Sequence, residues 1–154
     1  MSKKLKYRMY GLVNYQLSGT IHAGIQFGHG VVEYVVKRLK KKGCKQWAKK
    51  DKTFIILSGG TTNNSGYLDT MGSMNKHLVT LKKYGIKIGE FYEPDLGDQL
   101  TAIVFLVDER VFDKVKYPDL TDDGMEVDWT EEIKGKKLGK ILFLRSFLQQ
   151  FRLA

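Results

Sequence analysis

Two histidines and one glutamine of this sequence are spaced so that they fall on one face of a helix. His22, Gln26 and His29 are four and three residues apart, and Glu33 continues the spacing four residues later. At about 100° per residue, these side chains lie within about 60° of one another. They project near the start of the predicted helix, where free backbone N–H groups favour a phosphate or an oxyanion. Imidazoles at such a place can act as acids, bases or metal ligands near neutral pH.

The same pattern also has a purely structural interpretation. In that interpretation His29 is buried and satisfied by hydrogen bonds, and His22 is a surface residue. Their position at a strand-to-helix turn favours a functional role instead. Zinc binding is the weaker hypothesis, because the histidines are seven residues apart, helical zinc ligands are typically four apart, and Cys44 is distant in the chain. We therefore expect neither a metal nor a cofactor.

A second group of polar residues forms the turn 93–99, which brings three carboxylates and an amide between two apolar segments. If this turn faces the first helix, Glu93 or Asp95 could orient or activate His22, as general acid–base chemistry requires. The alternative is an ordinary polar hairpin. The ligand spacing of a calcium loop is absent from the turn, so calcium binding is not expected.

The loop 58–66, with the sequence SGGTTNNSG, follows a predicted strand and precedes a predicted helix. Its backbone amides could hold a phosphate, although the lysine of a Walker loop is missing. A plain flexible loop is the alternative. The predicted substrate-binding residues come from this loop, the start of the first helix and the acidic turn: Ser18, Thr20, Gln26, His29, Asp98, Gln99, Gly59, Gly60, Thr61 and Thr62.

Charge is unevenly distributed along a chain whose net charge is +9. Residues 37–52 contain nine basic residues and one aspartate, whereas 119–132 contain seven acidic residues and no Lys or Arg. A basic patch attracts polyanions such as tRNA through counterion release, and its alternative is a solvated helix end. We expect tRNA or a smaller nucleotide as the partner. A homodimer is also compatible with the sequence. The predicted RNA-binding patch comprises Lys37, Arg38, Lys40, Lys41, Lys42 and Lys45.

The pattern of apolar residues predicts the elements that carry these side chains. Strands are predicted at 7–14, 53–57, 86–92 and 100–107. Helices are predicted at 21–42, which Gly43 closes, at 67–84 and at 137–153, and a further helix is predicted to begin within 108–117. The alternation predicts an α/β fold, a three-layer domain with a four-stranded mixed, mostly parallel sheet flanked by helices. The core-facing stripe predicted for the first helix is Ile21, Ile25, Gly28, Val32, Val35, Val36 and Leu39.

The length of 154 residues corresponds to one ordinary domain. We expect an α/β domain at 1–117, an acidic exposed loop at 118–136 and an amphipathic helix at 137–154 that packs on the domain or on a partner. No apolar run is long enough to cross a bilayer, and no signal-peptide core follows the basic start. With a single cysteine, Cys44, these features lead us to expect a cytoplasmic protein without membrane contact.

The segment 18–30, with the sequence SGTIHAGIQFGHG, resembles the first-helix motif of the archaeal and eukaryotic type of peptidyl-tRNA hydrolase, GKxAAQxxHA. Gln26 and His29 match its glutamine and histidine. Trp47, the second strand, the second helix and a Thr-containing strand at Thr101 follow in the family's order, so the resemblance covers about 7–107. The family's catalytic lysine is replaced by His22, and its GRTQ-like loop by 93–98.

Three functional hypotheses follow. The resemblance implies an esterase that cleaves peptide from tRNA, in which a histidine activates water and a threonine or the helix amides stabilise the oxyanion. The first alternative is a protein that binds or processes a nucleotide through the helix start and the loop 59–62. The second is a non-catalytic adaptor that binds protein through its C-terminal helix. For the esterase, the predicted catalytic residues are His22, Glu93, Asp95 and Thr101.

Overall fold

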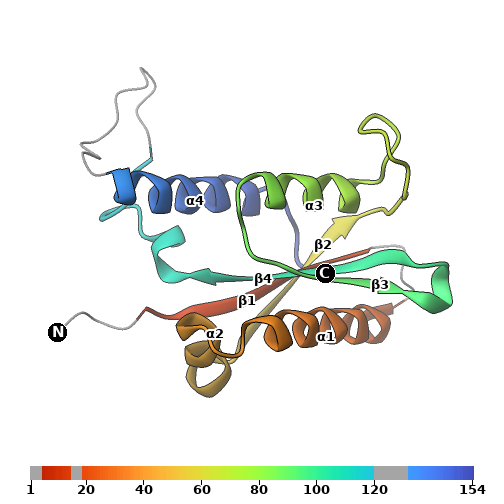
Figure 1. Cartoon of the computed structure of the whole chain (residues 1–154), viewed down its shortest axis with the longest axis horizontal. Coiled ribbons are helices and arrows are strands. Elements are labelled where there is room, and N and C mark those ends of the chain that lie inside the picture. The colour runs from red at the N-terminus through yellow and green to blue at the C-terminus, as the bar shows by residue number, and fades with distance from the viewer. Residues whose placement is uncertain (1–4, 15–18, 120–131) are drawn as a thin grey trace.

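The computed structural model describes residues 5–14, 19–119 and 132–154 and places a four-stranded sheet between two layers of helices (Figure 1). The strand order is β2-β1-β4-β3. β1 pairs with β2 in parallel, and β4 pairs antiparallel with both β1 and β3. The strands are β1 (Tyr7–Asn14), β2 (Thr53–Gly60), β3 (Gly89–Glu93) and β4 (Gln99–Asp108).

The α/β class and the mixed sheet are confirmed, but the prediction of a mostly parallel sheet is wrong. β3 and β4 are joined only by residues 94–98, a connection too short for a parallel crossover. β4 then returns through the middle of the sheet, between β3 and β1, and so runs antiparallel to both neighbours. The β1–β2 pair is the parallel one because a long helix connects its strands.

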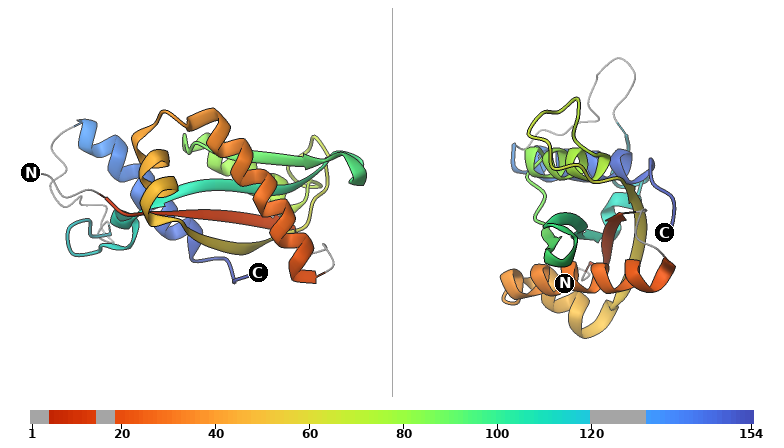
Figure 2. Two further views of the ribbon diagram at one scale, coloured as in Figure 1. Left: turned by 90° about the horizontal axis from the view of Figure 1, so that it is seen from below. Right: turned by 90° about the vertical axis from the view of Figure 1, so that its right-hand side faces the viewer.

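The helices lie on opposite faces of the sheet (Figures 1 and 2). One face carries α1 (Gly19–Arg38), α2 (Lys42–Gln46) and the π-helical turn η1 (Trp47–Asp51), and α1 runs obliquely across the strands. The other face carries α3 (Ser73–Lys83) and α4 (Glu132–Leu148). Two short 3-10 turns complete the fold, η2 (Pro94–Leu96) and η3 (Glu109–Phe112). Among the described helices, none is both long and apolar enough to span a membrane.

Each face of the sheet has its own hydrophobic core because side chains alternate along the strands. On β1, Met9 and Val13 point toward the α1 layer, whereas Tyr10 and Leu12 point toward α3 and α4. The larger core lies on the α3–α4 face and includes three α4 residues, Ile141, Leu144 and Phe147. The C-terminal half of α4 therefore packs on the sheet of its own chain.

The prediction of the α1 core stripe is wrong. Most of its members are exposed, with Ile21 76% and Val36 74% accessible, and Val35 is only partly buried. α1 has a second apolar face, and its aromatic residues Phe27 and Tyr34 are the ones that reach the sheet. Gly30 lies on that face, where a Cβ atom would collide with the Val104 side chain 2.5 Å away. The glycine thus allows the backbone of α1 to approach β4 closely.

Several predicted boundaries also differ. α1 ends at Arg38, so Gly43 does not close it but lies within α2. α3 begins at Ser73, six residues later than predicted, and within 108–117 only the turn η3 is helical. After α4 the chain turns back along the edge of β2, where Ser58 N donates to Arg152 O at 2.9 Å. Most of the acidic segment expected as a loop, residues 120–131, lies outside the described residues.

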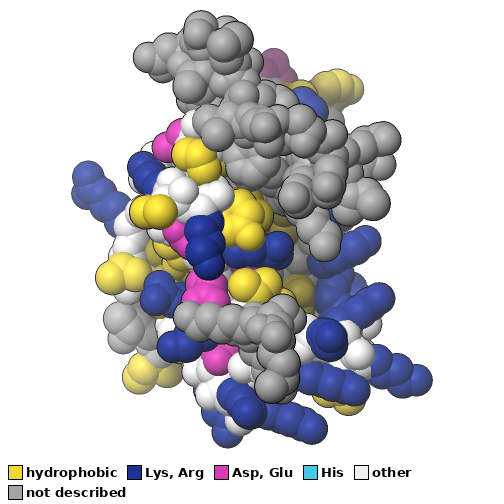
Figure 3. Space-filling model, turned by 90° about the vertical axis from the view of Figure 1, so that its left-hand side faces the viewer, with side chains coloured by type: hydrophobic (Ala, Val, Ile, Leu, Met, Phe, Trp, Pro, Cys, Tyr) yellow, Lys and Arg dark blue, Asp and Glu magenta, His cyan; other side chains and the backbone are white. Residues whose placement is uncertain are grey.

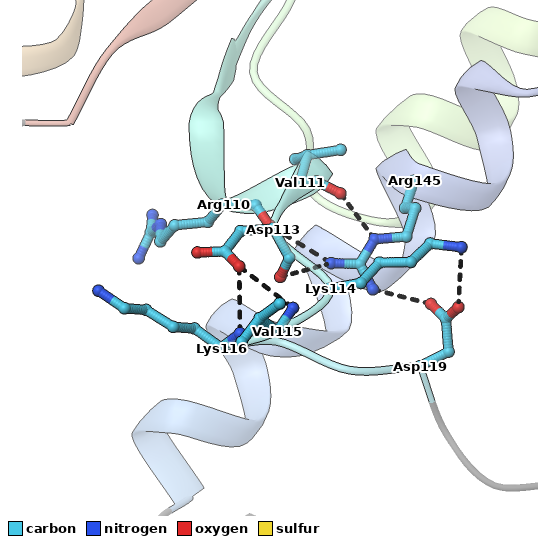
Figure 4. A network of polar contacts seen from close by, with 8 residues as sticks. All are labelled: Arg110, Val111, Asp113, Lys114, Val115, Lys116, Asp119 and Arg145. Atoms are coloured by element: carbon cyan, nitrogen blue, oxygen red, sulfur yellow. Dashed lines mark hydrogen bonds and ion pairs between the residues drawn. The ribbon is translucent and has the colours of Figure 1, made fainter.

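A buried arginine joins α4 to the segment that follows β4 (Figure 4). Arg145 is 5% exposed; its Nε donates to Val111 O at 2.6 Å and its Nη1 to Asp119 Oδ1 at 2.7 Å. Its Nη2 lies 3.3 Å from Arg110 O. One guanidinium therefore satisfies carbonyls of η3 and fixes the start of the segment that leads to α4.

Candidate functional site

A chain of hydrogen bonds connects α1 with both strands of the β3–β4 hairpin. Thr101 Oγ1, on β4, donates to Gln26 Oε1 of α1 at 2.6 Å. Gln26 Nε2 donates in turn to Glu93 Oε2, at the end of β3, at 2.9 Å. Gln26 and Thr101 are 6% and 1% exposed, so a buried amide and hydroxyl hold a carboxylate at the boundary with solvent.

The local backbone explains why Thr101 faces the helix. In the β3–β4 ladder Phe91 pairs with Ala102 and Tyr92 pairs with Leu100, so the register shifts at this point and Thr101 is left without an opposite residue. Such a bulge re-aims one side chain and is frequent beside functional sites. Here it directs the Thr101 hydroxyl toward Gln26, on the face that α1 covers.

The Glu93 carboxylate is held in its ionised form. The hydrogen bond from Gln26 lowers the pKa of Glu93 below its ordinary value of 4.5, with smaller contributions from the Asp95 backbone N–H and from the charge of His29. The Asp95 N–H donates to Glu93 Oε1 at 3.3 Å. Each carboxylate oxygen therefore has one fixed donor, and both donors are electrically neutral groups.

The imidazole associated with this carboxylate is that of His29. Its ring stacks on Phe91, with the ring centroids 4.4 Å apart, and its other side is exposed. His22 is exposed two turns before His29 on α1, and no hydrogen bond or ion pair joins it to another described residue. The structure thus brings Gln26, His29, Glu93 and Thr101 together, but the expected pairing of His22 with Glu93 or Asp95 is not formed.

A second polar chain fastens the loop after β2 to the same end of the sheet. Asn14 Nδ2, at the end of β1, donates to Thr62 Oγ1 at 2.8 Å, and Thr62 Oγ1 donates to Leu100 O at 2.6 Å. Asn64 Nδ2 lies 3.3 Å from Asp98 O. Sequence reasoning missed Asn14, Asn64 and Phe91. A polar residue that ends the apolar strand β1 was the available signal for Asn14.

The loop expected to hold phosphate uses its polar groups internally. Thr61 N donates to Ser73 Oγ at 2.9 Å, and Asn63 N donates to Asn75 Oδ1 at 3.0 Å. Gly59 and Gly60 belong to β2, so the loop itself begins only at Thr61. These contacts make the segment a brace between β2 and α3. Of the other predicted binding residues, Asp98 and Gln99 are exposed in the hairpin, and Ser18 and the side chain of Thr20 lie outside the described residues.

The predicted RNA-binding patch lies at the opposite end of α1. Lys37 is eleven residues beyond Gln26, which corresponds to about 16 Å along the helix axis. Figure 3 views this end of the molecule and shows Lys and Arg side chains around it. Arg38 is partly buried, and the five lysines of the patch are exposed: Lys37, Lys40, Lys41, Lys42 and Lys45.

Neither a scan of protein-family models nor a comparison with curated proteins finds a match to this chain. The chemistry of the site is therefore judged from its geometry. Among the described residues, no three His, Cys, Asp or Glu side chains converge as metal ligands would. What the hairpin and α1 do bring together is an ionised carboxylate, an exposed imidazole and a buried amide that fixes the carboxylate. Such a group can bind a polar substrate and move a proton.

Proposed function

We propose that this protein hydrolyses an ester bond in an RNA-linked substrate, peptidyl-tRNA, at the site formed by Gln26, His29, Glu93 and Thr101. The observation that carries the proposal is the directed chain from Thr101 through Gln26 to Glu93. The buried Gln26 amide is fixed in one orientation because both its oxygen and its nitrogen are hydrogen-bonded, and such fixed groups are typical of a preorganised site. The resemblance to the peptidyl-tRNA hydrolase family supports it at three of these four positions, Gln26, His29 and Thr101.

In this proposal an imidazole acts on the attacking water. The water oxygen bonds to the carbonyl carbon of the ester while the imidazole of His29 accepts the water proton. The bond between that carbon and the ribose oxygen then breaks, and the imidazolium returns the proton to the ribose oxygen. Glu93 is suited to stabilise the imidazolium because its carboxylate is ionised and lies close enough to interact with the charge of His29.

The remaining residues act through these two. Gln26 and Thr101 are positioning residues, since their hydrogen bonds fix the carboxylate and they are buried away from solvent. His22 is exposed two turns nearer the start of α1 than His29 and is the second candidate for the base.

The net charge of +9 supports an RNA-linked substrate. A tRNA is long enough to contact the lysines at the end of α1 while its ester lies at Glu93. The adaptor hypothesis has less support, because the apolar residues of α4 are used in the core of the same chain. The nucleotide hypothesis also has less support, because the backbone amides of the loop 61–63 are already used in internal hydrogen bonds.

The test is cleavage of an N-acetylaminoacyl-tRNA by the purified chain. We expect wild-type turnover, and a loss of about a hundredfold or more in His29→Ala and in Glu93→Gln. Glu90→Gln is the matched control, because Glu90 is on the same strand but pairs with Lys82 at 3.2 Å. His22→Ala decides between the two imidazoles: a loss larger than that of His29→Ala would make His22 the base. Absence of wild-type turnover would contradict the proposal.

A further inference from the structure

The sheet has a notch at its β3 edge because β3 is much shorter than β4. The β3–β4 ladder stops at the pair Gly89–Val104, so in the described structure β4 has a strand on only one side over 105–108. The end of α1, the segment 85–87 and residues 140–144 of α4 border this open edge. They enclose a cavity of about 560 Å³. This volume is within the range of sites that bind small molecules.

Positive charge dominates the lining of the notch. The only carboxylate among the described lining residues, Asp108, is bound by Arg110 in a two-pronged ion pair, with Nε–Oδ1 and Nη2–Oδ2 distances of 2.9 Å. Asp108 therefore does not neutralise the other cations among the described lining residues. The cationic residues of the lining are Lys37, Arg38, Lys41, Lys87, Arg110 and Lys140.

Arg38 is the unusual member of this group. Its guanidinium carbon lies 4.5 Å from the centroid of the Tyr34 ring, which fixes the group against the helix. Its Nη1 atom is buried and has no hydrogen-bond acceptor among the described residues. A guanidinium is charged at every physiological pH, and a buried donor without an acceptor is destabilising. Arg38 also lines the notch, and a guanidinium carries further N–H groups that can donate to an anion there.

We propose that this notch binds the phosphate groups of a nucleotide-sized polyanion, with Arg38 as the central ligand. Phosphate oxygens accept hydrogen bonds from guanidinium and ammonium groups in the geometry that arginine favours. The neutral groups of the lining do not oppose an anion: burial raises the pKa of Tyr34 to about 12, and burial raises the pKa of Cys44 also.

This site is separate from the one proposed for hydrolysis. Arg38 is twelve residues from Gln26 along α1, about 18 Å, so one small ligand cannot occupy both. The phosphates could belong to a free nucleotide or to the backbone of an RNA. Both sources present the same oxyanions, and the two can be distinguished by the choice of probe.

The experiment measures direct binding, so its outcome does not depend on turnover. Pyrophosphate, a nucleoside diphosphate and a 5′-phosphorylated RNA tetramer are titrated into the full chain by calorimetry at low and at physiological salt. We expect binding by wild type and a loss of at least tenfold in affinity in Arg38→Gln and in Lys87→Ala. Lys87 is exposed in the segment before β3, so its replacement does not disturb the core.

The control is Lys49→Ala combined with Lys50→Ala, since these exposed lysines belong to the same basic stretch but do not line the notch. Unchanged affinity in this control would support a defined site. An equal loss in the control, or no wild-type binding to any of the three probes, would overturn the proposal. Binding of the two small probes identifies a free nucleotide as the ligand, and binding of the tetramer alone identifies RNA.

A second inference rests on the outer face of α1, which no described element covers. Ile21, Ile25, Val32, Val36 and Leu39 form one stripe there and are each at least 51% exposed. Gly28 lies in the middle of the stripe, and a Cβ at this position would meet no atom within 4 Å. Glycine lowers helix stability and is not needed here by the fold of the chain, so close approach of another backbone would explain it.

We infer that the occupant of this face is α1 of a second copy, crossing antiparallel with its two-fold axis near Gly28. The stripe is symmetric about that point, because Ile25 and Val32, and likewise Ile21 and Val36, lie at equal distances from the middle. A two-fold interface requires such self-complementarity. The arrangement also brings the lysine-rich end of each α1 toward the start of α1 in the partner, where the acidic turn after β3 lies.

Light scattering and a cross-linking variant test the interface. We expect a wild-type dimer at tens of micromolar, a monomer for Val32→Glu, and a dimer for Val115→Glu, which is 92% exposed elsewhere. Gly28→Cys should form a disulfide-linked dimer on oxidation. Gly24→Cys should not, because its two copies would be about 13 Å apart along the axis. A wild-type monomer, or equal cross-linking by both variants, would overturn this inference.

Discussion

Two of the polar networks that cross between elements of this fold differ in how their charge is balanced. At one end Arg145 of α4 binds Asp119, and Lys114 lies 3.5 Å from the same carboxylate. At the other end Gln26 of α1 binds Glu93, whose second fixed donor is a backbone N–H. Both carboxyl groups have a lowered pKa, through a cation in the first case and through a neutral amide in the second.

The difference separates a structural network from one suited to chemistry. The Asp119 charge is compensated by two cations, and the guanidinium of Arg145 also donates hydrogen bonds to carbonyls of η3 (Figure 4). The Glu93 charge is oriented but not neutralised, and it interacts with the exposed imidazole of His29. A fixed, uncompensated carboxylate can stabilise a cation that forms during a reaction. The predictions below test whether the two networks separate in this way.

The largest effect on folding is expected for Arg145→Met. The change leaves η3 carbonyls and Asp119 without their donor, and we expect the free energy of unfolding to fall by about 3 kcal/mol. Chemical denaturation measures it. Lys114→Met is the control, because Lys114 is exposed and should cost less than about 0.5 kcal/mol. A loss of ester hydrolysis per folded molecule in Arg145→Met would contradict the purely structural role.

Gln26→Leu is expected to have a smaller effect on folding and a larger one on the site. It removes the acceptor of the buried Thr101 hydroxyl, so we expect a loss of about 2 kcal/mol. Glu93 loses its donor as well, and hydrolysis should fall by about a hundredfold. Measuring both quantities on the same preparation compares the networks directly. Unchanged hydrolysis would show that Gln26 positions nothing that matters to the reaction.

Thr101→Val should have a milder effect, because valine has nearly the same shape and removes only the hydroxyl. We expect a loss of about 1 kcal/mol from the unpaired Gln26 Oε1 atom. Thr101→Ser keeps the hydroxyl and should retain more of the hydrolytic activity than Thr101→Val. Equal activity in the two variants would mean that the hydroxyl itself is not needed to hold Gln26.

The smallest effect is on the acid dependence of stability. Because the pKa values of Glu93 and Asp119 lie below 4.5 and 3.8 in the folded protein, each group stabilises the fold above its ordinary pKa. That contribution should be lost as the pH falls through the lowered values. NMR titration should show the pKa of Glu93 rise in Gln26→Leu and that of Asp119 rise in Arg145→Met. An unchanged pKa in either variant would contradict the assigned cause.

The sequence predicted β1 to the residue because its apolar run is buried on both faces of a central strand. The same reasoning gave the wrong face of α1. Helical periodicity does not show which of two apolar faces of a helix packs on the sheet. In α1 that choice depends on the close approach of Gly30 to β4. The position of β4 between β1 and β3 was not predicted either, since residue patterns do not specify where a strand is inserted in a sheet.

The candidate site was predictable in its residue types but not in its pairing. Gln26 was chosen from its helical spacing with the histidines, Glu93 from the acidic turn and Thr101 from the resemblance, and the three do converge. Their order in the hydrogen-bond chain depends on the bulge at Thr101, a shift of one residue in register that leaves no mark in the sequence. The stacking of His29 on Phe91, which places that imidazole by the hairpin, depends on the same register.

The most direct measurement compares single-turnover cleavage of N-acetylaminoacyl-tRNA by wild type, Glu93→Gln and Glu90→Gln under identical conditions. Our account predicts that wild type and Glu90→Gln cleave at similar rates and that Glu93→Gln is slower by about a hundredfold. Equal rates for all three proteins, or no cleavage by any of them, would contradict the assignment of the hairpin carboxylate as the centre of the site.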